Sequence, residues 1–162
     1  MDDLAQPKTN ELLNRVMQAE LAGVVRYTSY ALIIVGPNRL PLVDFMKQQA
    51  TESLAHALQV GELLTGLDGI PSVTIQDIDG PAPSSVADVL QASLDHEQGA
   101  LAIYKELLRE VEGKSVYLEE FSRSQIAAEE LHVMEMRKLL RDYMPGVEHS
   151  LGVMHVDDAP AR

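Results

Sequence analysis

The chain has 162 residues and a formal net charge of −12, because 25 acidic residues outnumber 13 basic ones. Such an acidic surface repels phosphate backbones and anionic lipid headgroups, so neither nucleic acid nor a membrane is expected as a partner. The absence of cysteine excludes disulfides, thiolate-bound zinc, iron–sulfur clusters and thiol catalysis. The N-terminus is acidic where a signal peptide would be basic, and no apolar run is long enough to span a bilayer. We therefore expect a cytoplasmic protein.

Four segments without proline follow one another along the chain, at residues 9–35, 42–65, 85–112 and 115–143. In the first, third and fourth, apolar residues recur at steps of three and four, which places them on one face of a helix. Prolines and glycines concentrate between the segments. The sequence predicts an all-α fold, a four-helix bundle over residues 1–145, followed by a C-terminal tail over 146–162 with little regular structure.

The lengths of the connections predict the topology of this bundle. The links after the first and third segments are short, so each of these segments should run antiparallel to the next one. The link over residues 66–84 is long enough to run the length of the bundle, which lets the second and third helices be parallel. We therefore expect one long crossover between helices two and three.

Three glutamates, Glu20, Glu97 and Glu129, lie on helical stripes that should face the core. An unpaired buried carboxylate costs several kcal/mol unless it is neutralised. Three such residues on three different helices call for a shared cation, and the nearby basic residues lie beside these stripes rather than on them. A bound metal ion is the simplest explanation.

Two histidines support a metal site. His132 follows Glu129 by three residues, and His56 follows Glu52 by four, so each pair can reach one site from one helix. Carboxylate and imidazole together suit iron, manganese or zinc. Because several carboxylates converge and no thiolate is available, we expect a dinuclear iron site rather than structural zinc.

This pattern resembles the ferritin-like di-iron carboxylate proteins, which carry one Glu on each of two helices and Glu-x-x-His on the other two. It is similar to the bacterioferritins in particular, over residues 9–143. The resemblance rests on four local matches, namely Glu20-Leu21 with Tyr27, His56-Ala57 with Gly69-Ile70-Pro71, Glu97 with Tyr104-Lys105-Glu106, and Glu129-Glu130-Leu131-His132.

The resemblance implies a ferroxidase that oxidises Fe(II) to Fe(III) with O2 or peroxide for iron storage or detoxification, with manganese or zinc as alternative metals. It implies one ligand set, which comprises Glu20, His56, Glu97, Glu129 and His132. Tyr27 would lie beside these ligands, where it would form a hydrogen bond to one of them or donate an electron. Tyr104 is interpreted as a core tyrosine.

The second helix departs from the family, because Ser53 stands where a bridging Glu should precede His56 by three residues. Glu52 is adjacent, but one residue corresponds to about 100° around a helix. Three carboxylates leave two divalent ions with a net positive charge, whereas four balance them. Two interpretations remain open: Glu52 is a substitute ligand, or the site is depleted and holds metal less tightly.

Three further positions bear on the comparison with the bacterioferritins. A gapless count would place His96 rather than Glu97 at the third-helix ligand position, but Glu97 shares the core stripe, so His96 is interpreted as a flanking polar residue. Leu54 occupies the position of the haem-binding Met, so haem is not expected. The tail lacks the periodicity of a fifth helix, and His149 and His155 within it are expected to be solvated. A homo-oligomer is expected, at least a dimer, with a large shell as the open alternative.

Two other functions remain compatible with the sequence. One is a non-storage di-iron or di-manganese oxidoreductase that uses the same ligands. The other is a non-catalytic bundle subunit whose metal site is impaired by the serine at position 53.

Overall fold

The computed structural model describes residues 6–143, which form four long helices. They are α1 (Gln6–Ile33), α2 (Arg39–Gly66), α3 (Val86–Val111) and α4 (Val116–Arg141). The predicted all-α four-helix bundle is confirmed, with helix bounds within a few residues of the proline-free segments. None of the described helices is both long enough and apolar enough to cross a bilayer. The tail expected at 146–162 lies outside the described residues.

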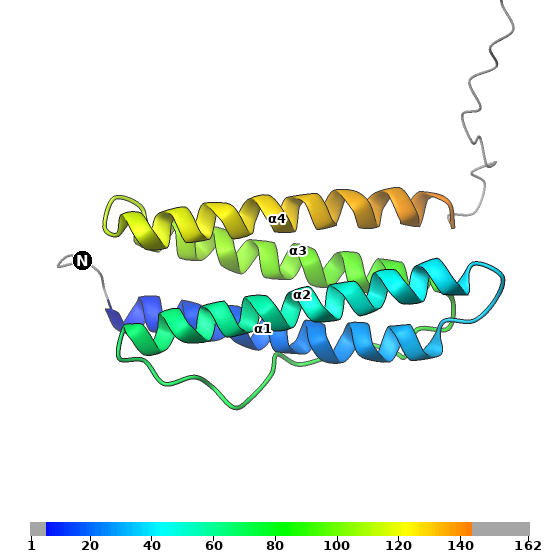
Figure 1. Cartoon of the computed structure of the whole chain (residues 1–162), viewed down its shortest axis with the longest axis horizontal. Helices are drawn as coiled ribbons and strands as arrows, with labels where there is room; N and C mark the ends of the chain where they lie inside the picture. Colours follow the sequence, from blue (N-terminus) through cyan, green and yellow to red (C-terminus); the bar gives the residue numbers. More distant parts are fainter. Residues whose placement is uncertain (1–5, 144–162) are drawn as a thin grey trace, which may run out of the picture.

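The four helices lie side by side, and the connection between α2 and α3 crosses the bundle as predicted (Figure 1). This crossover is attached to α1 by hydrogen bonds. The Asn14 side chain donates to Ile70 O at 3.0 Å and accepts from Ser72 N at 2.8 Å, and Gln76 N donates to Gln18 O at 3.0 Å. The backbone of α1 and a polar side chain on it therefore fix the path of the long link.

The helix ends follow from local sequence. Ser85 and Ser115 are extended residues whose hydroxyls accept hydrogen bonds from Asp88 N and Leu118 N, which caps α3 and α4. The link between α1 and α2 turns at Gly36, whose φ of +103° is a conformation that side chains disfavour.

The apolar core consists of two clusters separated along the bundle axis. One contains Leu13, Leu64 and Leu107, and the other contains Met46 and Leu90. The core-facing carboxylates Glu20, Glu97 and Glu129 occur between them in sequence on α1, α3 and α4, so the two apolar clusters enclose a polar layer.

The packing of the helices leaves one side of the bundle open. Helix α1 packs against α2 and α3, and α3 packs against α4, but no Cα atom of α2 lies within 8 Å of one of α4. Only side chains therefore close the flank between α2 and α4.

Candidate metal centre

Two overlapping groups of side chains form the polar layer. The first comprises Glu20 from α1, His56 from α2 and Glu129 from α4, and the second comprises Glu97 from α3 with Glu129 and His132. In each group, one ligand atom from every residue lies within 4.8 Å of the others. The three carboxylates are 2–4% exposed. The structure thus brings together the five principal ligands expected from the sequence, and Glu129 is common to both groups.

The imidazoles face the carboxylates through the same ring atom. His56 Nδ1 lies 3.3 Å from both Glu20 Oε1 and Glu129 Oε1. His132 Nδ1 lies 3.4 Å from Glu129 Oε2 and 3.8 Å from Glu97 Oε2. The two oxygens of Glu129 therefore point to different histidines, which is the arrangement that a carboxylate shared by two metal ions requires.

The pKa values show how the polypeptide balances these buried charges. Burial lowers the pKa of His56, but the neighbouring carboxylates of Glu129 and Glu20 outweigh it and raise the pKa to about 10. Glu129 and Glu97 raise the pKa of His132 to about 10. Burial raises the pKa of Glu129, but His132 and His56 bring it down to about 2. Without a metal ion, the positive charge of the two protonated imidazoles thus offsets the negative charge of the buried carboxylates.

The residues of the two groups fit a metal pair. His56 Nδ1 and Glu129 Oε2 are buried polar atoms without a hydrogen-bond partner of good geometry among the described residues. Such atoms are costly unless something binds them. A metal ion would bind both, and the carboxylate–imidazole donor set suits iron, manganese or zinc.

Two tyrosines donate hydrogen bonds to Glu97 and Glu20, each from the opposite helix of the α1–α3 pair. Tyr27 on α1 donates its hydroxyl to Glu97 on α3, and Tyr104 on α3 donates to Glu20 Oε1 on α1 at 2.8 Å. Both rings are fully buried. The expected place of Tyr27 beside the ligands agrees with this contact. The matching role of Tyr104 was missed, although it follows Glu97 by the same seven residues that separate Tyr27 from Glu20.

Glu52 lies outside both groups and contacts the outer side of the His132 ring. Its Oε2 lies 3.1 Å from His132 Nε2, the ring nitrogen opposite the one that faces Glu129. Gln48 and Gln49 donate hydrogen bonds to the same carboxylate at 3.0 and 3.2 Å. Metal-binding histidines commonly donate their second ring N–H to a carboxylate, which fixes the ring and its tautomer. Glu52 has this position relative to His132.

Position 53 is filled differently from the expected motif. The Ser53 side chain is buried, and so is His96, which was interpreted as a flanking polar residue and is 9% exposed. The His96 ring contacts the Tyr27 ring edge-on at a centroid distance of 5.8 Å. Leu54, at the position associated with haem binding, is exposed on α2.

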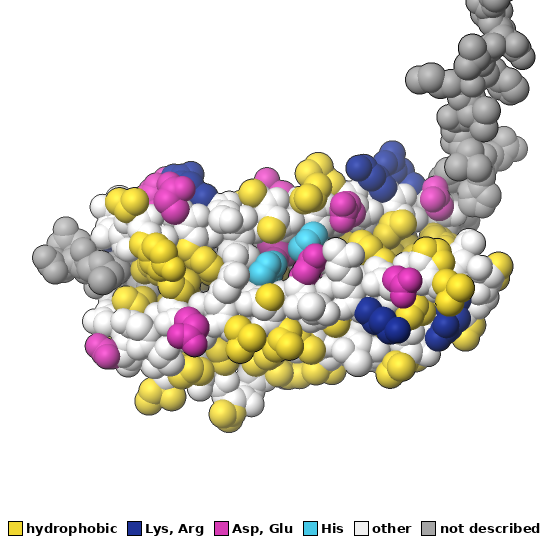
Figure 2. Space-filling model, viewed as in Figure 1, with side chains coloured by type: hydrophobic (Ala, Val, Ile, Leu, Met, Phe, Trp, Pro, Cys, Tyr) yellow, Lys and Arg dark blue, Asp and Glu magenta, His cyan; other side chains and the backbone are white. Residues whose placement is uncertain are grey.

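The centre opens on the flank between α2 and α4. Figure 2 shows histidine and carboxylate side chains together at the surface of this flank. The His56 and His132 side chains are 15% and 14% exposed, and Glu52 is 34% exposed. A solvent cation therefore meets Glu52 and the two imidazoles before it meets the buried carboxylates.

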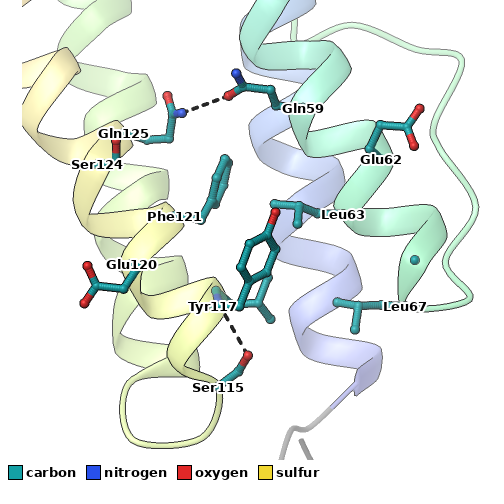
Figure 3. Close-up of a pocket in the computed structure, with 12 residues that line it drawn as sticks. Gln59, Glu62, Leu63, Leu67, Ser115, Tyr117, Glu120, Phe121, Ser124 and Gln125 are labelled. Atoms are coloured by element: carbon teal, nitrogen blue, oxygen red, sulfur yellow. Dashed lines mark hydrogen bonds between the residues drawn. The ribbon is translucent and has the colours of Figure 1, made fainter.

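A groove of about 750 Å³ lies further along the same flank. It is formed by side chains of α2 and α4, among them Leu63, Tyr117 and Phe121, and by Leu67, which directly follows α2 (Figure 3). Gln125 Nε2 donates to Gln59 Oε1 at 3.1 Å and closes the end of the groove nearest the metal centre. This groove is therefore largely apolar and lies beside the centre rather than over it.

Comparison with known proteins gives one family and several structures. A family model described as a ferritin-like domain matches residues 10–144. No curated protein sequence matches the chain. Structural similarity is found to a ferritin-like, diiron-carboxylate protein from Bacillus anthracis, with a TM-score of 0.80, 21% identity and coverage of 83% of this chain and 96% of that one.

Two other structures with the same fold are related to bacterioferritin by their descriptions. One is the dodecameric thioferritin of Bacteroides fragilis, a bacterioferritin-related protein, with a TM-score of 0.81, 21% identity and coverage of 88% and 89% of the two chains. The other is the bacterioferritin of Rhodobacter capsulatus, with a TM-score of 0.74, 21% identity and coverage of 85% and 86%. At this identity the likeness concerns the fold.

Proposed function

The chain belongs to the ferritin-like domain family, and we propose that it is a ferroxidase that oxidises Fe(II) at a dinuclear site. The observation that carries this proposal is the pair of ligand groups that share Glu129. A shared carboxylate holds two ions close enough to act on one oxidant. Two Fe(II) ions supply two electrons, which O2 and two protons accept to give H2O2, and two Fe(III) ions are formed.

In this proposal each residue has a defined task. Glu20 and His56 would hold one ion, Glu97 and His132 would hold the other, and Glu129 would be shared by both. Tyr27 and Tyr104 hold the terminal carboxylates in place through their hydroxyl hydrogen bonds. Glu52 orients His132 from behind rather than serving as a ligand. The bound metals supply the electron-transfer chemistry toward the oxidant.

Aerobic Fe(II) oxidation, followed by absorbance of Fe(III), tests the activity. The parent protein should oxidise Fe(II) faster than buffer, and Glu129→Gln should lose this acceleration because both ions lose a ligand. Glu130→Gln is the matched control, since Glu130 is adjacent on α4 but half exposed and paired with Lys105. A parent no faster than buffer, or a Glu129→Gln variant equal to the parent, would contradict the proposal.

We further propose that the protein acts as a homo-oligomer. Exposed apolar side chains on α1 and α2 favour self-association, among them Val25, Leu32, Leu40, Leu54 and Leu58.

Size-exclusion chromatography with light scattering distinguishes between the proposed functions of the metal site. A large shell that retains Fe(III) supports storage or detoxification, whereas a stable dimer favours the non-storage oxidoreductase. Elemental analysis of the purified protein for Fe, Mn and Zn identifies the native metal. Purified protein that contains none of these metals and takes up none on titration favours the non-catalytic subunit.

A further inference from the structure

The apolar groove between α2 and α4 has an acidic rim. Leu63, Tyr117 and Phe121 form its apolar surface, and Tyr117 is 72% exposed. Glu62 from α2 and Glu120 from α4 lie on opposite sides of these side chains and point away from them (Figure 3). Neither carboxylate has an ion-pair partner among residues 6–143. The groove therefore suits a segment that combines an apolar side chain with positive charge.

One face of α4, close to the C-terminal end of this helix, has that combination. Met134 is 51% exposed, and Arg137, Lys138 and Arg141 follow it by three, four and seven residues. This spacing places the four side chains together, and they form the basic face of α4. The three bases are exposed, and none of them forms an ion pair within the described part of the chain. The basic face thus presents one apolar side chain surrounded by positive charge.

The groove and the basic face cannot meet within one chain. Phe121 and Met134 lie on the same unbroken helix, where their separation in sequence corresponds to about 20 Å. They can meet only between two copies. Because each copy has a net charge of −12, copies repel one another unless opposite charges face each other locally. The acidic rim of one copy and the basic face of another provide such a contact.

We propose that the basic face of α4 in one copy docks in the α2–α4 groove of a second copy. Met134 packs against Tyr117 and Phe121 of the second copy, and the bases on either side of it pair with Glu62 and Glu120. A helix that lays one apolar side chain into a groove is a common form of recognition between proteins. This inference extends the proposed homo-oligomer and does not depend on the ferroxidase activity.

The contact joins two different surfaces, so it is heterologous. A pair of copies joined in this way retains one free groove and one free basic face, and only a closed ring of copies fills every groove. The exposed apolar residues Val25 and Leu32 of α1 do not line the groove. A contact through them can therefore coexist with this one in a single assembly.

Charge reversal tests the contact through the mass of the assembly, measured by size-exclusion chromatography with light scattering. Glu62→Lys/Glu120→Lys makes the rim positive, and Arg137→Glu/Lys138→Glu makes the basic face negative. Each double variant should form a smaller particle than the parent, with the affinity between copies lowered by about tenfold or more, because like charges then meet. The quadruple variant that combines all four changes should regain the parent mass, because opposite charges meet again. A chain that had merely lost its fold would not regain it.

Lys8→Glu/Arg109→Glu is the matched control and should keep the parent mass. These two bases border a hollow between α1 and α3, and their reversal changes the net charge as much as Arg137→Glu/Lys138→Glu does. Double variants of unchanged mass, a quadruple variant that stays small, or a control that dissociates equally would overturn the inference. A monomeric parent would also overturn it, and the groove would then be left to another occupant, such as residues 144–162 of the same chain. All of these outcomes leave the proposed ferroxidase standing, because Fe(II) oxidation per chain is measured separately.

Discussion

The halves of the proposed metal centre contributed by the two helical hairpins are not equivalent. The α3–α4 half provides two buried carboxylates, Glu97 and Glu129, and a histidine supported from behind by Glu52. The α1–α2 half provides one carboxylate, Glu20, and His56, which follows a serine at the motif position. The same fold thus carries a complete Glu-x-x-His motif on one hairpin and an incomplete one on the other.

This difference implies an order of binding. The ligand group of the α1–α2 half is complete only when it includes Glu129 from α4. The α3–α4 half needs no residue from α1 or α2 to complete its own group. We therefore expect the first metal ion to bind at the α3–α4 half and the second to bind more weakly at the α1–α2 half.

Glu129→Ala should weaken metal binding in both halves at once, and it should have the largest effect on metal affinity of the variants considered. Each ion loses a ligand, so Zn²⁺ affinity should fall by about a hundredfold or more at both sites. In the metal-free protein two imidazolium groups would lose their shared counter-charge, which should cost about 3–5 kcal/mol of unfolding free energy. Chelator competition and urea denaturation measure the two effects. Two tightly bound ions in the variant would contradict the bridging role.

The order of binding predicts different results for the two histidines. His56→Ala should leave one tightly bound ion per chain, because Glu97, Glu129 and His132 remain intact. His132→Ala should remove the tight site and leave only the weaker one. Elemental analysis after dialysis gives the stoichiometry for both variants. Equal retention of metal by the two variants would show that the halves are equivalent.

Proton release should sharpen the same comparison. The pKa values of His56 and His132 are raised to about 10, so both imidazoles carry protons at pH 7 that ligation must displace. Metal affinity should therefore rise with pH, with about two protons released when both sites fill and about one in His56→Ala. Calorimetry in two buffers of different ionisation enthalpy measures the number. Binding without proton release would contradict the pairing of these groups.

The same pKa values set the pH dependence of the metal-free fold. A histidine pKa raised above its unfolded value stabilises the fold fully below that value, about 6.5, and the stabilisation is lost as the pH rises toward 10. Glu129 has a lowered pKa, so its contribution is present above about 4.5 and is lost as the pH falls toward 2. Thermal unfolding should show the highest melting temperature between these limits. Added metal should reverse the loss on the alkaline side.

The sequence predicted the bundle and the residues that meet inside it, because both depend on helical periodicity. Steps of three and four place Glu20, Glu97 and Glu129 on the same helix faces as the apolar core residues. Because those faces pack inward, the glutamates could be assigned to the interior without knowledge of the exact rotation of each helix. The long link fixes which helices are parallel. These features tolerate an error of a residue or two at the helix ends.

The contacts of Glu52, His96 and Tyr104 were not predictable in this way. Each depends on the rotation of a helix and on a side-chain rotamer set by a residue from another helix. Glu52 could be placed near the centre but not behind His132, and His96 was interpreted only as a flanking polar residue beside Glu97. The repeated seven-residue spacing of glutamate and tyrosine was the one signal for Tyr104.

Glu52→Gln should affect only the α3–α4 half. The amide keeps the size of the side chain but removes the charge that holds His132 by its Nε2 atom. We expect two ions to remain bound, with the affinity of the tighter site lowered by about tenfold. Glu62→Gln, on the same helix but at the groove, is the control and should leave binding unchanged. Loss of a whole ion would instead show that Glu52 is itself a ligand.

The two tyrosines provide the smallest and most symmetrical test. Tyr27→Phe removes the hydrogen bond to Glu97 and Tyr104→Phe removes the one to Glu20, while both rings stay in place. Each bond to a buried carboxylate should contribute about 1.5–3 kcal/mol to the unfolding free energy of the metal-free protein. Metal binding should respond unequally, because Tyr104→Phe loosens Glu20, the only carboxylate of the weaker half, whereas Tyr27→Phe leaves Glu129 to hold the other ion. A larger loss of the second ion in Tyr27→Phe would mean that the α3–α4 half is the weaker one.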